Sequence, residues 1–142
     1  MEEVRAIEKT LSTNDLGANG THQGGMLIPK GGDLLSFFPA LDSTAVNPRV
    51  VIYFTDESAQ KWKFSFIYYN NKFRGGTRNE YRLTGMTAFF RSGNLKIGDR
   101  IIFKRRDDEY TIQYRRQDAS EKTTSDGIVR LVLNSEWRII DF

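Results

Sequence analysis

Two polar, glycine-rich segments hold most of the side chains in this sequence that could bind a partner through hydrogen bonds. They are LSTNDLGANGTHQGG, residues 11–25, and NNKFRGGTRNEYR, residues 70–82. Both are rich in residue types that pair with base edges in the DNA major groove, where arginine binds guanine, asparagine and glutamine bind adenine, and carboxylates accept hydrogen bonds from cytosine. Their glycines would allow the backbone to approach a partner closely. Flexible hairpin tips are the alternative interpretation of both segments.

The sequence does not support the common catalytic or cofactor motifs. The glycines of residues 17–24 lack the G-x-G-x-x-G spacing, and Gly75-Gly76-Thr77 lacks the lysine of a phosphate-binding P-loop. No Pro-Asp is followed at a suitable distance by the Glu-x-Lys of a magnesium-dependent nuclease. The single histidine excludes a multi-histidine nuclease centre, and the acids of residues 107–109 are expected to form a solvated turn. We therefore expect no catalysis, no metal site and no cofactor in this chain.

Length and composition indicate one folded domain over residues 1–142. A chain of 142 residues with 39% hydrophobic and 13% aromatic residues can form a substantial core. Its apolar runs are too short to span a bilayer, and no basic and apolar leader opens the sequence. The absence of cysteine excludes disulfides and thiolate metal sites. These features favour a cytoplasmic protein without a membrane partner.

Positive charge is concentrated in one part of the chain. Residues 72–116 contain twelve Lys and Arg against five Asp and Glu, a net charge of +7, so the rest of the chain carries −4 of the total of +3. Such a basic block attracts polyanions. A solvated charged face is the alternative interpretation.

Strands account for most of the expected secondary structure. Residues 50–57 and 61–69 combine apolar, aromatic and β-branched residues over strand lengths and are expected to pair. Apolar positions that alternate around Asp107-Asp108 predict a hairpin over residues 100–116. Two further short strands are expected within residues 127–142.

Two short helices are expected between these strands. The first would begin at a capping Asp33 and end at Pro39, and the second would begin at a capping Thr84 and end at Gly93. Many short strands with two short helices predict a mainly β fold, a closed or half-closed barrel.

Both polar segments lie within motifs that resemble the N-terminal DNA-recognition domain of the EcoRII-type restriction endonucleases. TLSTNDLGANGTHQGGMLIP is similar to a Ser-x-Asn-Asp-x-Gly-Ala-x-Gly-x-His-Gln run that precedes a short strand ending in Ile-Pro. YYNNKFRGGTRNEYRLT is similar to a Tyr-Tyr-Asn segment that leads into Thr-Arg-Asn-Glu-x-Arg-x-Thr. More loosely, FFRSGNLKIGDRIIFKR resembles the auxin-response-factor type of DNA-binding pseudobarrel, which belongs to the same superfamily. The resemblance covers about residues 4 to 116.

The resemblance implies a seven-stranded DNA-binding pseudobarrel that grips the major groove with two arms. The first arm would be Ser12 to Gln23 and the second Lys72 to Arg82. The candidate DNA-contacting residues are Ser12, Asn14, Asp15, Asn19, Thr21, His22 and Gln23 in the first arm, and Lys72, Arg74, Thr77, Arg78, Asn79, Glu80 and Arg82 in the second.

Individual positions both match and depart from the family. His22 falls on the arm histidine, and Arg78, Glu80 and Arg82 fall on charged second-arm residues. Gly76 and Tyr81 stand where the family has lysines, which puts the phosphate contacts and the recognised base pairs in question.

The function implied by the resemblance is sequence-specific recognition of double-stranded DNA, as the target- or effector-binding domain of a type II restriction endonuclease. A CC(A/T)GG-like site is expected, with each arm reading one half. A catalytic domain in cis, beyond Phe142, would then cut DNA with Mg²⁺. The alternatives are a free-standing transcription regulator with the same barrel, and a small enzyme or sugar-binding barrel that uses the polar loops.

The basic block makes a prediction about salt. If this chain binds duplex DNA through phosphates, the logarithm of its affinity should fall with the logarithm of salt concentration, by a slope of about 0.9 per phosphate neutralised. Fluorescence anisotropy with a labelled duplex between about 50 and 200 mM salt measures this slope. A constant affinity over that range would exclude phosphate contacts as the basis of binding.

Overall fold

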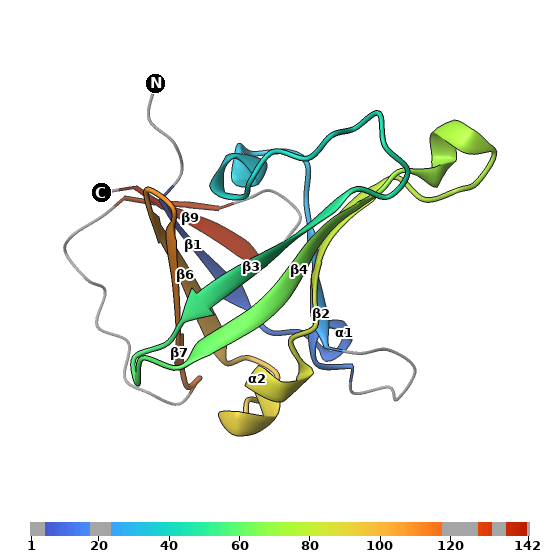
Figure 1. The fold of residues 1–142 in the computed structure, drawn as a ribbon. Coiled ribbons are helices and arrows are strands. Elements are labelled where there is room, and N and C mark those ends of the chain that lie inside the picture. The colour runs from blue at the N-terminus through green and yellow to red at the C-terminus, as the bar shows by residue number, and fades with distance from the viewer. Residues whose placement is uncertain (1–4, 18–23, 118–127, 132–135, 142) are drawn as a thin grey trace.

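Nine strands form one sheet in the computed structural model, which describes residues 5–17, 24–117, 128–131 and 136–141. The strands are β1 Ala6–Thr10, β2 Gly25–Ile28, β3 Arg49–Thr55, β4 Lys61–Tyr69, β5 Glu80–Thr84, β6 Arg100–Arg106, β7 Glu109–Arg115, β8 Ile128–Leu131 and β9 Trp137–Asp141. Their order across the sheet is β2-β5-β4-β3-β7-β6-β1-β9-β8. Figure 1 shows the sheet curled, with β1, β6 and β9 behind β3 and β4. The predicted mainly β barrel is therefore confirmed, as an open one.

The strand pairings explain where the barrel turns and where it stays open. Neighbouring strands are antiparallel except β3 and β7, which run parallel and pair only at Phe54 and Thr55. The end strands β2 and β8 are not paired with each other in the described sheet. Instead the indole N–H of Trp137 in β9 donates to the carbonyl oxygen of Leu27 in β2, at 3.0 Å. A side chain thus joins the two halves where backbone pairing is missing.

The strand count differs from the seven that were expected. The hairpin of β6 and β7 turns at Asp107-Asp108 as predicted, with Asp107 at φ 55°. The strands that were not expected from the sequence are β1 and β5, each five residues long. β5 begins inside the polar segment of residues 70–82, where charged residues obscure the alternation that marks a strand.

Four short helical segments connect the strands: α1 Thr13–Leu16, η1 Leu34–Phe37, η2 Asn71–Arg74 and α2 Thr87–Ser92. Two of them, η1 and α2, are the expected helices. The others, α1 and η2, lie in the two polar segments and were not predicted. None of the helices in the described chain is long and apolar enough to cross a membrane.

The predicted start at Asp33 is confirmed in position but lacks a side-chain cap, whereas the predicted start at Thr84 is wrong. Asp33 has a left-handed backbone, φ 65°, instead of the extended backbone of a capping residue, and η1 is a single 3-10 turn. Thr84 remains in β5, where it pairs with Gly25 of β2 and Ser65 of β4. The predicted end of α2 at Gly93 is confirmed, since its N–H donates to the Phe89 carbonyl oxygen at 3.2 Å.

Aromatic rings fill the interior of the barrel. The largest fully buried side chains include Phe37, Phe54, Phe64, Phe66, Phe103 and Trp137. The ring of Phe54 lies 5.4 Å from those of Phe64, Phe103 and Tyr110. Strands β3, β4, β6 and β7 therefore meet at Phe54.

Truncating Phe54 should lower the free energy of unfolding. Phe54 is 0% exposed, and replacing a buried phenylalanine by alanine costs about 3–5 kcal/mol. Urea denaturation of Phe54→Ala measures the loss. The matched control is Tyr53→Ala, because Tyr53 is the next residue of β3, is 56% exposed and should change stability by no more than about 0.5 kcal/mol. Similar losses for the two variants would place the core elsewhere.

Candidate nucleic-acid interface

The two polar segments emerge at opposite ends of β5. The second segment leads into Glu80, the first residue of β5, whereas the first segment leads into Gly25 of β2, which pairs with Thr84 at the other end of β5. Four residue steps of a strand separate these ends by about 13 Å. Figure 1 shows α1 and η2 on the same side of the barrel, at the lower and upper right. The structure thus brings the described parts of the two predicted arms to one side, with the β2–β5 pair between them.

Basic side chains occupy the outward face of the sheet beside the arms. In β3 and β4, Phe54, Phe64 and Phe66 point inward, so the alternate positions point outward. We call the outward cations of β3, β4 and β5 the basic sheet face; they are Arg49, Lys61, Lys63 and Arg82. Among the described outward residues of these three strands, Glu80 is the only acid.

Sequence reasoning missed three members of this face, namely Arg49, Lys61 and Lys63. The signal was present, because Lys61 and Lys63 alternate with Trp62 and Phe64. That alternation, applied to charge instead of hydrophobicity, would have placed both lysines outside the barrel.

The first segment begins with a capped helical turn. The N–H of Asp15 donates to Ser12 Oγ at 3.3 Å, and the N–H of Ser12 donates to Asp15 Oδ2 at 2.9 Å, which forms a capping box. Gly17 ends α1 with a left-handed backbone, φ 66°. Ser12 is thus primarily a capping residue.

Asp15 is the one candidate with a buried side chain among those whose side chains the structure describes. Its Oδ2 lies 2.6 Å from Lys9 Nζ, and both side chains are only 6% exposed. The same oxygen accepts from Lys9 Nζ and from the Ser12 N–H. In the described structure Asp15 therefore holds the root of the first arm.

The other first-arm candidates divide into described and undescribed residues. Asn14 is exposed on the outer side of α1, as is Thr13. Asn19, Thr21, His22 and Gln23 lie outside the described residues. The described chain resumes at Gly24, whose N–H donates to Thr87 Oγ1 at 2.7 Å and whose carbonyl oxygen accepts from the Met86 N–H at 3.0 Å.

Asn71, which was not among the candidates, organises the second arm. Its Oδ1 accepts from the Arg78 N–H at 2.8 Å, and its carbonyl oxygen accepts from the Gly76 N–H at 2.7 Å. The Lys72 N–H donates to the Arg78 carbonyl oxygen at 2.8 Å. These bonds close the segment into a compact loop on which Lys72 and Thr77 are exposed. The backbone of Arg74 ends η2, and its side chain lies outside the described part of the structure.

Arg78 is held in a defined position at the base of this loop. Its guanidinium carbon lies 3.7 Å from the ring centroid of Tyr69, a cation–π contact. One guanidinium nitrogen lies 3.5 Å from Glu80 Oε2, which also accepts from Arg82 at 3.0 Å. The predicted second-arm residues Arg78, Glu80 and Arg82 therefore form one cluster, and Tyr69 completes it.

Asn79 is connected to the core through a stack of rings. Its Oδ1 accepts from the Tyr68 hydroxyl at 2.7 Å. The rings of Tyr68 and Tyr81 are stacked at 4.2 Å, and Tyr81 is stacked in turn on Phe66 at 5.7 Å. Tyr81 is thus a packing residue.

The electrostatics of Glu80 reflect its two arginine partners. Burial by itself would raise the pKa of Glu80, but the hydrogen bond and charge of Arg82, together with those of Arg78, outweigh burial and lower the pKa below 4.5. Glu80 is therefore ionised at neutral pH, and it orients both guanidinium groups.

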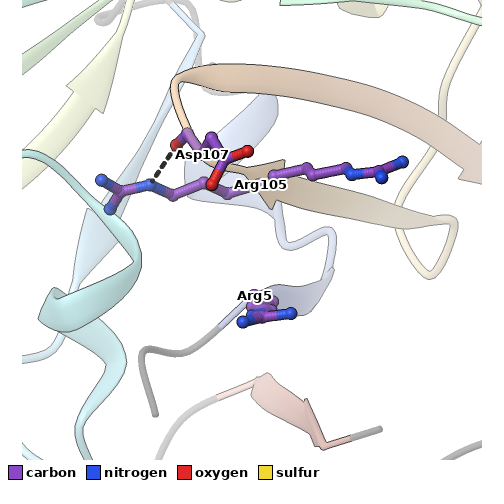
Figure 2. Close-up of a pocket in the computed structure, with 4 residues that line it drawn as sticks. Arg5, Arg105 and Asp107 are labelled. Carbon is purple, nitrogen blue, oxygen red and sulfur yellow. Dashed lines mark hydrogen bonds between the residues drawn. The ribbon is translucent and has the colours of Figure 1, made fainter. Parts of the chain in front are cut away.

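A hollow lined by Arg5, Arg105, Arg106 and Asp107 lies at the β6–β7 turn, away from both arms. As Figure 2 shows, Arg105 Nε donates to the Asp107 carbonyl oxygen, at 3.1 Å. Arg105 also donates to the Phe37 carbonyl oxygen at 3.0 Å, so its guanidinium joins η1 to the turn. No group of three or more potential metal ligands occurs among the residues that the structure describes.

Comparison with known sequences identifies relatives of this chain. The family described as "Restriction endonuclease EcoRII, N-terminal" matches residues 2–95. The Type II restriction enzyme EcoRII of Escherichia coli is 39% identical over 79 residues, which are 54% of this chain and 19% of that enzyme. Auxin response factor 12 of Arabidopsis thaliana is 29% identical over 102 residues, 72% of this chain and 16% of that protein. The chain thus spans less than a fifth of the length of these relatives.

Solved structures have the same fold. The Arabidopsis FUS3–DNA complex matches with a TM-score of 0.60 and 23% identity, over 77% of this chain and 94% of that one. The complex of the Arabidopsis thaliana transcription factor LEC2 with DNA matches with a TM-score of 0.56 and 20% identity, over 80% of this chain and 92% of that one. The expected pseudobarrel fold is therefore confirmed.

The second-arm cluster makes a prediction about pH. The Glu80 carboxyl, followed by NMR, should titrate below 4.5, and Arg82→Gln should raise its midpoint because the strongest hydrogen bond is lost. Since the folded-state pKa is lowered, the cluster stabilises the fold above the unfolded-state pKa, and this contribution is lost as the pH falls through the folded-state value. Arg49→Gln, on the same face, should leave the midpoint unchanged. A midpoint above 4.5 in the unaltered protein would contradict the ion pairs.

Proposed function

The chain belongs to the family of the N-terminal domain of the restriction endonuclease EcoRII, and from this premise we propose that it binds double-stranded DNA at a specific sequence. The arms of residues 12–23 and 72–82 would enter the major groove. The chain would act as the target- or effector-binding domain of a type II restriction enzyme and would not itself cut DNA.

The arrangement of the arms is the observation that carries this proposal. Their roots are about 13 Å apart along β5, and the major groove is about 12 Å wide. The basic sheet face lies beside them with four cations and one acid, which suits a phosphate backbone. The names of the matched relatives, a restriction enzyme and two neighbours solved with DNA, support the same interpretation.

The described residues suggest how sequence would be read. Arg78 presents a planar guanidinium already held by Tyr69 and Glu80, and arginine binds both acceptors of guanine with two parallel hydrogen bonds. Asn14 presents an exposed amide, which suits adenine. Lys72 and Thr77 at the loop, with Arg49 and Lys63 on the sheet, would contact phosphates and position the protein.

The biological context is part of the proposal. The similarity to EcoRII favours a restriction enzyme with a nuclease domain in cis, a Mg²⁺ requirement confined to that domain, and a CC(A/T)GG-like site. The alternative is a free-standing transcription regulator, which the match to an auxin response factor favours. The sequence that surrounds this chain in the full gene product distinguishes the two, because a following nuclease motif supports only the first.

Selection of bound duplexes from a randomised pool tests the proposed function. Arg78→Ala should weaken binding to the selected site by about tenfold to a hundredfold, because a bidentate base contact contributes about 1–3 kcal/mol, and should relax the preference at one position. Arg49→Ala should weaken cognate and random duplexes alike. Arg106→Ala, in the hollow away from both arms, is the control with an equal change of charge.

Equal losses for Arg78→Ala on cognate and random duplex would exclude Arg78 from reading a base. If Arg106→Ala lowered duplex affinity as much as Arg49→Ala, DNA would contact the β6–β7 turn, and an interface at the arms and the basic sheet face would be contradicted. Asn14→Ala should relax a position in the half-site opposite to that of Arg78, since the arms lie at opposite ends of β5. Two protein chains on one short site would contradict a monomer that uses unlike arms.

A further inference from the structure

A buried ion pair fixes the root of the first arm. Lys9 lies in β1 and Asp15 in α1, and their charged atoms are 2.6 Å apart. Lys9 Nζ also donates to the Thr10 carbonyl oxygen at 2.8 Å and lies 3.5 Å from Oε1 of the half-exposed Glu136. Because burial of an unpaired charge is costly, each member of the pair requires the other.

The helix α1 depends on this pair for its conformation. It has four residues, and a single helical turn is not stable by propensity alone. The same Asp15 Oδ2 that binds Lys9 accepts from the N–H of Ser12, so one oxygen both caps the helix and attaches it to β1. Leu16 packs against the core and fixes the rotation of the turn.

This attachment determines where the exposed residues of α1 point. Asp15 and Leu16 face the barrel, and Thr13 and Asn14 face outward. Leu11, which precedes the capping Ser12, is fixed as well. Its N–H donates to the Asp99 carbonyl oxygen at 2.8 Å, and its carbonyl oxygen accepts from the Gly98 N–H at 2.9 Å. The first arm therefore starts from a rigid base.

We propose that Lys9 and Asp15 are positioning residues of the DNA interface. They touch no DNA, and they hold α1 in its folded conformation before DNA arrives, so that Asn14 is already oriented toward the groove. Ordering the arm in advance removes part of the entropy cost of binding and increases affinity. This inference rests on the proposed function.

The neighbouring residue Glu8 provides a matched control. It is also buried in β1, and its Oε1 lies 3.9 Å from a guanidinium nitrogen of Arg100 and 3.7 Å from one of Arg138. Successive strand residues point to opposite faces, so Glu8 points away from the pair at the arm root. Glu8→Gln disturbs a buried ionic contact of the same strand without touching α1.

The test compares Lys9→Met, Asp15→Asn, their double variant and Glu8→Gln. Three quantities are measured: the thermal midpoint, the hydrogen-exchange rates of the α1 amides without DNA, and the Kd for a duplex selected with the unaltered protein. Both single variants should accelerate exchange in α1 and raise Kd by about tenfold, a change of about 1.4 kcal/mol. The double variant should be no weaker than the singles, because the two residues act as one unit. Glu8→Gln should change Kd by less than about twofold, whatever its thermal midpoint.

Each result of these measurements either supports or contradicts the positioning role of Lys9 and Asp15. The inference is overturned if α1 exchange is unchanged in both single variants, or if Kd in all variants simply follows the thermal midpoint. Should Lys9→Met fail to fold, Lys9→Gln retains a hydrogen-bond donor and takes its place. If the unaltered protein selects no duplex, the proposed function fails and the inference with it, whereas unaltered Kd in the variants of a DNA-binding protein overturns the inference alone.

Discussion

The pairing of β4 with β5 sets Phe66 opposite Leu83 and Ile67 opposite Arg82. This register determines which side chains enter the barrel and which form the basic sheet face. A shift of one residue would turn Leu83 outward and bury Arg82, because side chains alternate along a strand. It would also separate Glu80 from Tyr69, its partner in the register, and so dismantle the surroundings of Arg78. The pairing of β4 with β5 thus determines both the core on the inner face of the sheet and the candidate interface on its outer face.

The two arms are held by different physical means. The first arm begins in a buried ion pair and a capping box, in which charge and backbone hydrogen bonds fix one helical turn. The second arm stands on aromatic rings, with Asn79 bonded to Tyr68 and Arg78 lying over Tyr69. In both cases polar residues at the surface are oriented by contacts with residues of the neighbouring strands. These contacts fix the described parts of both glycine-rich segments.

Much of the fold could be predicted from the sequence because its signals are local. The strands around Phe54 and Phe66, the turn at Asp107 and the end of α2 at Gly93 follow from alternation and from turn residues. Contacts between elements could not be read in this way. The burial of Asp15 depends on how α1 lies against Lys9 in β1, and the position of Arg78 depends on a loop closed by Asn71.

Residue types and resemblance indicated which segments form the arms, but they did not indicate what each side chain does. The Asp15 carboxylate, for example, can accept hydrogen bonds from a helix N-terminus or from a base edge, so its residue type does not distinguish the two roles. The basic sheet face was missed because alternation was applied to hydrophobic residues and not to charge, and because Arg82 joins the cations of β3 and β4 only through strand pairing.

Because the two arms differ, the two ends of the candidate interface are not equivalent. One end of β5 carries a capped turn with an exposed amide, and the other carries a guanidinium stacked on a ring. A single chain that sits on a palindromic sequence with such unlike ends can do so in two equivalent orientations, and each one breaks the symmetry of the site. Any domain joined to the barrel would then lie on one side of the palindrome. The complex would be asymmetric although the DNA sequence is symmetric.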